Sequence, residues 1–113
     1  MSSFSKPELD ALARQRESVL DHLLSDADQA TAFMSSTSQM ADTQQFKRCL
    51  AEGEDMARHL IRCLDTRIND MTMVWLILLT RITGERVIKD ENVGRVYLMG
   101  RDWLEWGRAQ GWV

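Results

Sequence analysis

The sequence contains few of the residues that interrupt helices. It has one proline, Pro7, and six glycines among 113 residues. Proline lacks a backbone N–H and clashes with the preceding helical turn, so its absence after position 7 permits long uninterrupted helices. The length suits one domain with a core of its own, and we assign residues 1–113 to a single helical domain.

Cysteine and histidine are also scarce, which limits disulfide and metal chemistry. Cys49 and Cys63 are the only cysteines and stand fourteen residues apart. On one straight helix that separation is roughly 21 Å, too long for a disulfide. Two free thiols are typical of a reducing compartment, so we expect a cytoplasmic protein.

No catalytic or cofactor motif is recognisable. His59 and Cys63 lie four residues apart and could present two ligands to zinc, but structural zinc takes four ligands and His22 is the only other histidine. Asp55 and His59 could act as an acid–base pair, yet the chain has no nucleophile elbow and no glycine-rich phosphate loop. We therefore expect no catalytic residue, no metal, no cofactor and no enzymatic activity.

Charge and hydropathy do not favour nucleic acid or membrane as partner. The net charge is −3, with acids interleaved among the arginines. A helix-turn-helix needs an apolar residue at a fixed offset from its turn glycine, and testing Gly53 or Gly84 in that role places His59 or Asp90 there. The N-terminus has no apolar signal segment, and the most apolar stretch is shorter than the ~20 residues that span a bilayer.

The spacing of apolar residues predicts an all-α fold, a small bundle of three to five helices. The expected elements are a disordered segment at 1–4, a helix over about 6–24 that could restart at 25–28, a loop at 35–42, a helix from Thr43 to about 69, and a helix over about 71–83. "SKPE" at Ser5–Glu8 is a capping box, and Gly84 is a suitable stop for the last of these helices. A heptad-like series from Phe46 to Leu64 makes the helix after Thr43 the most regular element.

Residues 85–99 fit two structures. Two short strands could flank a turn at residues 89–92, or a helix could run from Glu91 to about Gln110. We favour the helix, in which Gly100 and Gly107 share a face one heptad apart. Small residues at these positions would let another helix approach closely.

The stretch Met71–Ile82, "MTMVWLILLTRI", has almost no polar side. One face carries a core stripe, while Met73, Leu76 and Ile77 lie largely on the other. A helix that is apolar all round must be buried all round. Either the helix over 6–24 covers the second face, or another chain does. We favour another chain, because a domain of three or four helices rarely has a fully enclosed central helix. Covering about 300 Å² of apolar surface would be worth several kcal/mol at about 25 cal/mol per Å².

Tryptophan and methionine strengthen the case for a binding surface. The chain has four tryptophans and seven methionines, residue types that favour binding hot spots and adaptable surfaces, although ordinary core packing also uses them. We expect a homodimer that binds a partner protein. The expected partner-binding residues are Met73, Leu76, Ile77, Thr80, Val96, Trp103 and Trp106.

The chain resembles the small bacterial quorum-sensing antiactivators of the QslA type. The resemblance rests on whole-chain size and on the segments "MVWLILL" and "RDWLEWGRAQGWV". It implies a dimer that binds the ligand-binding domain of a LuxR-type activator, disrupts the activator's own dimer and keeps it off DNA. The expected function is therefore regulation through an apolar helical face. A small DNA-binding regulator and a secretion or assembly chaperone are the alternatives.

Overall fold

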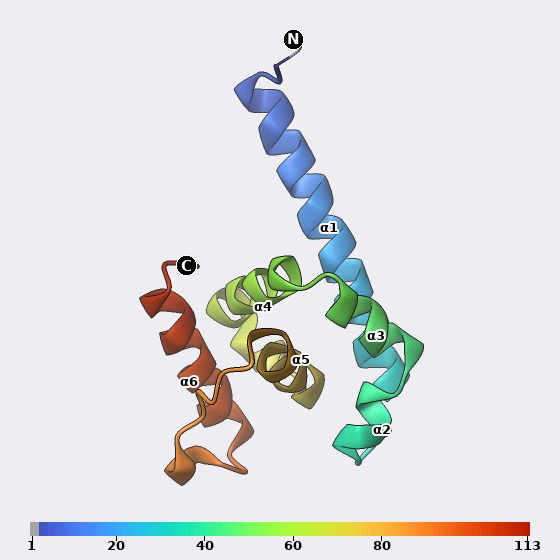
Figure 1. Cartoon of the computed structure of the whole chain (residues 1–113), viewed down its shortest axis with the longest axis vertical. Coiled ribbons are helices and arrows are strands. Elements are labelled where there is room, and N and C mark those ends of the chain that lie inside the picture. Colours follow the sequence, from blue (N-terminus) through green and yellow to red (C-terminus); the bar gives the residue numbers. More distant parts are fainter. Residues whose placement is uncertain (1–2) are drawn as a thin grey trace.

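The first helix, α1, runs without a break from Lys6 to Thr31 (Figure 1). Ser5 caps it, as expected: its Oγ accepts the backbone N–H of Glu8 at 3.3 Å. The Glu8 carboxylate reaches back to the Ser5 hydroxyl, which donates to it at 3.0 Å, whereas a capping box uses the backbone N–H of the first residue. The expected end near residue 24 is wrong, because no glycine or proline follows that would stop the helix there.

The computed structural model describes residues 3–113 and is all-α, which confirms the expected class. After α1 come α2 (Thr37–Ala41), α3 (Gln44–Ala51), α4 (Glu54–Arg67), the 3₁₀ segment η1 (Ile68–Asp70), α5 (Met73–Thr83), the 3₁₀ segment η2 (Asp90–Asn92) and α6 (Val96–Ala109). Six α-helices exceed the expected three to five, and no strand occurs within residues 3–113. Of the segment expected to be disordered, residues 3 and 4 lie outside any helix and residues 1 and 2 lie outside the described residues.

The segment expected to be a loop, 35–42, contains the short helix α2. Ser36 caps it, with its Oγ accepting the backbone N–H of Gln39 at 3.4 Å. Met40 and Ala41 are buried. A serine cap and two residues that pack into the core therefore stabilise a helix inside a stretch whose composition is typical of a loop.

The expected helix after Thr43 is two helices, because Gly53 takes a left-handed backbone with φ of +60°. Thr43 caps α3 as expected, its Oγ1 accepting the backbone N–H of Phe46 at 3.2 Å. The heptad series continues across the break and supplies the core on both sides. Its buried members and their neighbours are Phe46, Cys49, Met56, Ala57, Leu60, Cys63 and Leu64.

The last helix, α6, begins at Val96, five residues later than expected, and no hairpin precedes it. Gly94 has φ of +87°, which a right-handed helix cannot include. The buried carboxylate of Asp102 fixes the preceding connection. It accepts the backbone N–H of Lys89 at 3.0 Å and the side-chain amide of Asn92 at 2.9 and 3.1 Å.

Helix α5 lies at the centre of the bundle and contacts each of the other five helices. Its buried residues are Val74, Trp75, Leu76, Leu78 and Leu79. Six helices enclose what three or four could not, so most of the second apolar face is covered within the chain. Leu76 is 3% exposed, which corrects the expectation that it lies on a free face. Within residues 3–113, no helix is both long enough and apolar enough to cross a bilayer.

Asp28 of α1 fixes the start of α5. Its carboxylate accepts the Thr72 hydroxyl at 2.6 Å and the Trp75 indole N–H at 3.1 Å. Burial raises the pKa of Asp28, and these two hydrogen bonds oppose that rise. A carboxylate at this position also faces the positive end of the α5 dipole.

Two glycines allow α6 to pack closely, as expected. A Cβ at Gly107 would lie 2.3 Å from Ile61 Cγ2 of α4, and a Cβ at Gly100 would lie 2.6 Å from Met71 Sδ. Both distances are shorter than van der Waals contact, so neither position has room for a side chain unless its neighbour moves.

The N-terminal half of α1 projects beyond the bundle (Figure 1). Its first buried residue is Leu20, fourteen residues after the helix begins. The radius of gyration is 14.9 Å, larger than the about 13 Å of a compact chain of this length. The projection accounts for the excess.

Cys49 is enclosed and should be unreactive in the folded protein. Its thiol donates to the Leu23 carbonyl at 3.3 Å, and burial, with the nearby carboxylate of Asp28, raises its pKa to about 12. About one thiol in ten thousand is then ionised at pH 8. We expect the reagent DTNB to modify Cys49 only as fast as the protein unfolds, measured by peptide mass spectrometry. Labelling at the rate of a free thiol would contradict this environment.

Candidate functional site

An apolar groove of about 240 Å³ lies over α5. Four of the seven expected partner-binding residues line it, namely Met73, Leu76, Ile77 and Thr80. The other lining residues are Thr37, Arg81, Ile88 and Met99. The second face of α5 thus ends in a groove walled by α2, α6 and the connection between α5 and α6.

The four residues differ in how far they are accessible. Leu76 is buried, Met73 and Ile77 are half-buried, and Thr80 is exposed. The Thr80 hydroxyl donates to the Leu76 carbonyl at 3.0 Å, so it already has a hydrogen-bond partner. Met73 and Ile77 therefore supply most of the apolar surface that another molecule can reach.

The other three expected residues lie elsewhere. Trp103, although expected to bind the partner, is fully buried and does not reach the surface, and its indole N–H has no partner among residues 3–113. Val96 is 40% exposed at the start of α6. Trp106 is half-buried and lines a separate cavity of about 350 Å³ beside Trp112. The rings of Trp106 and Trp112 meet edge to face at 5.0 Å, and the Arg58 guanidinium lies 4.9 Å from the centre of the Trp112 ring.

The projecting half of α1 carries an apolar stripe formed by Leu9, Leu12 and Val19, here named the α1 stripe. These side chains are 52%, 46% and 50% exposed. At about 100° per residue they fall within an arc of about 80° on one side of the helix. Their helical spacing can be read from the sequence, but the sequence cannot show that these three side chains stay exposed.

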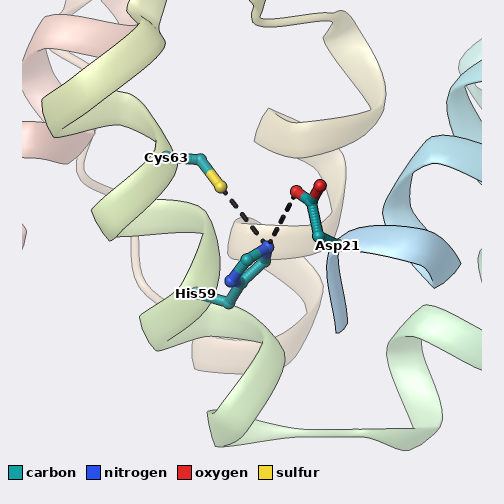
Figure 2. Close-up of side chains that lie close together, drawn as sticks. All are labelled: Asp21, His59 and Cys63. Carbon is teal, nitrogen blue, oxygen red and sulfur yellow. Dashed lines mark hydrogen bonds and ion pairs between the residues drawn. The ribbon is translucent and has the colours of Figure 1, made fainter. Parts of the chain in front are cut away.

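A polar cluster joins α1 to α4, here named the His59 cluster: Glu17, Asp21, His59 and Cys63. His59 Nδ1 lies 2.7 Å from a Glu17 carboxylate oxygen, and Nε2 lies 3.3 Å from Asp21 Oδ1 and 3.4 Å from Cys63 Sγ. Figure 2 shows Asp21, His59 and Cys63 pointing toward one another across the two helices. His59 and Cys63 are 5% exposed, whereas the two carboxylates are partly exposed.

Two arginines flank the His59 cluster at the edge of a cavity of about 390 Å³. Arg62 forms an ion pair with Glu17, and Arg67 forms one with Asp21. Arg67 also donates to Cys63 Sγ at 3.4 Å, and its guanidinium carbon lies 5.5 Å from the centre of the Trp75 ring. The His59 cluster and its two flanking arginines therefore bring together two cations, two carboxylates, an imidazole and a thiol.

The His59 cluster favours an imidazolium. Burial alone would lower the pKa of His59, but the hydrogen bonds with Cys63 and Glu17 outweigh it and raise the pKa to about 9. Burial would raise the pKa of Glu17, yet its bonds with His59 and Arg62 leave that pKa below its usual range. Asp55, considered as the partner of His59, instead pairs with Arg16 at 3.0 Å.

Sequence reasoning identified half of this cluster. His59 and Cys63 share a helical turn, so their proximity follows from spacing alone. Glu17 and Asp21 come from α1, 42 and 38 residues before His59, and no local pattern connects them to it. Comparison of the chain with protein-family models, with curated proteins and with solved structures finds no match.

Proposed function

We propose that this protein is a non-enzymatic, dimeric regulator that acts by binding a partner protein. The α1 stripe carries the proposal. It presents three large apolar side chains on a helix that leaves the bundle, and no residue of that helix before Leu20 is buried. Polar side chains tie the helix to the bundle at Arg16, which pairs with Asp55, and at Glu17, which bonds to His59.

A second copy of the chain fits the α1 stripe best. Leu9, Leu12 and Val19 match one a position and two d positions of a two-stranded coiled coil. Arg16, which pairs with Asp55, takes the a position between them. A helical segment with no buried side chain is marginal in water, so pairing with a second helix would stabilise it. The α1 stripe spans about 15 Å along the helix from Leu9 to Val19.

The groove over α5 supplies a separate surface for the partner protein. Met73 and Ile77 are accessible there, and the groove suits an apolar side chain from a partner helix. The resemblance to QslA-type antiactivators implies a LuxR-type activator as that partner and disruption of its dimer as the mechanism. Two free cysteines support a cytoplasmic location.

The dimer is tested by replacing Leu9 and Leu12 together with glutamate. We expect the wild-type protein to sediment as a dimer at micromolar concentration and the double variant to sediment as a monomer, because two charged residues cannot be buried in the seam. Circular dichroism should show a folded domain in both, since neither leucine packs in the core. A monomeric wild-type protein would overturn the dimer.

Leu20→Glu is the matched control on the same helix. Leu20 is 1% exposed, so the same substitution there should unfold the domain rather than separate two folded chains. Salt distinguishes the DNA-binding alternative, because phosphate binding weakens steeply as salt rises and apolar association does not.

A further inference from the structure

The geometry of the His59 cluster points to a metal site: we propose that Asp21, His59 and Cys63 bind one zinc-like divalent ion between α1 and α4. This site goes beyond the proposed function and does not depend on it. It also changes the expectation from sequence, in which His59 and Cys63 lacked further ligands.

The distances fit a tetrahedral ion. Zinc bonds of about 2.1 Å to nitrogen or oxygen and about 2.3 Å to sulfur place neighbouring ligand atoms about 3.3–3.6 Å apart. His59 Nε2 lies 3.3 Å from Asp21 Oδ1 and 3.4 Å from Cys63 Sγ, and all three ligand atoms lie within 4.8 Å of one another. Asp21 is 48% exposed, so its carboxylate is free to make the small adjustment toward the sulfur that completes the set.

Glu17 prepares His59 for this role. Its carboxylate contacts Nδ1 at 2.7 Å, which leaves Nε2 as the nitrogen that faces Asp21 and Cys63 (Figure 2). A carboxylate on the far nitrogen is the usual means of orienting a metal-bound histidine. The ion would replace the proton on Nε2 and the thiol proton of Cys63, and both protons would pass to solvent.

Arg67 marks the place of the ion. Its guanidinium bridges Asp21 and Cys63, the two ligands on either side of His59 Nε2. A divalent ion must displace this cation. The Arg67 side chain lies beside Trp75 but is 39% exposed, so its guanidinium can turn toward solvent. Three protein ligands leave a fourth position, which opens toward the cavity of about 390 Å³. Thiolate, imidazole and carboxylate together favour zinc over magnesium or calcium.

Cobalt titration tests the site. We expect Co²⁺ to produce a thiolate-to-cobalt charge-transfer band that saturates at one ion per chain and is abolished by added Zn²⁺. Cys63→Ser should remove the band, because its thiolate is the source of the charge transfer. Asp21→Asn removes one of the three ligands and Glu17→Gln removes the partner of Nδ1, so each should weaken cobalt binding by about 10- to 100-fold. Cys49→Ala removes the other thiol and should bind like the wild type.

Arg67→Met gives the opposite expected result. It removes the competing cation while keeping an apolar stem beside Trp75, so cobalt should bind more tightly than in the wild type. Circular dichroism checks that each variant is folded, and Asp21→Asn carries the test if Cys63→Ser does not fold. The site is overturned if wild type and Arg67→Met both lack the band, or if folded Cys63→Ser binds cobalt as the wild type does. Neither result would affect the dimer test, which uses different residues.

Discussion

Leu76→Arg should unfold the domain, while Ile77→Arg, one residue further along α5, should leave it folded. Leu76 is 3% exposed at the floor of the groove, and Ile77 is half-buried at its edge. An unpaired buried charge costs several kcal/mol, a large fraction of the 5–15 kcal/mol that stabilises a typical domain. At position 77 the long arginine stem can cover the groove while its charge reaches water, at a cost of about 1–2 kcal/mol.

Thermal unfolding followed by circular dichroism separates the two variants. Leu78→Arg provides the reference for complete burial, because Leu78 is 0% exposed and lies in the core. We expect Leu76→Arg to behave like Leu78→Arg. If Leu76→Arg instead melts cooperatively near the wild-type temperature, the groove is open enough to expose its floor. The folded Ile77→Arg protein should also lose co-purification with the partner protein, since the arginine stem would cover the groove and place a charge at its edge.

Gly107→Ala should destabilise the protein by up to about 2 kcal/mol, although alanine is the better helix former by about 1 kcal/mol. The new methyl group would lie 2.3 Å from Ile61 Cγ2, and Ile61 is branched and fully buried. Forcing a methyl group into a filled core typically costs about 1–3 kcal/mol, which outweighs the gain in helix propensity. Urea unfolding measures the difference.

Gly100→Ala is the matched control on the same helix. Its new methyl group would meet Met71 Sδ and Cε at 2.6 Å, the flexible end of an unbranched side chain. Methionine can turn aside at little cost, so the clash and the helix gain should nearly cancel. If both variants lose the same stability, the contact of Gly107 with Ile61 is no tighter than the contact of Gly100 with Met71, which would contradict this prediction.

The sequence allowed the helical class and several helix ends to be predicted, because these depend on local signals. The C-terminal end of α5 at Gly84 is an example: the residue has φ of +70° and needs the freedom of glycine. Enclosure of α5 could not be predicted in this way. Whether Leu76 is buried depends on how many other helices surround it. That number exceeds the expected range because Gly53 divides one expected helix into α3 and α4 and because α2 forms within an expected loop.

The two candidate surfaces show the same limit. Met73 and Ile77 were identified because an apolar residue outside the main stripe is visible in the sequence alone. The spacing of Leu9 continues that of buried residues later in α1, so the sequence alone does not distinguish its exposed side chain from theirs. Asp21 joins the His59 cluster only through the packing of α1 on α4.

The buried Asp102 carboxylate limits how this chain can change in evolution. It fixes a connection that contains no α-helix by bonding to Lys89 and Asn92 at once. An insertion or deletion between those two residues would separate the donors and leave a buried charge unsatisfied. Insertions and deletions after α5 are therefore tolerable only outside residues 89–92. This short segment should keep its length, while the segments on either side of it can vary in length.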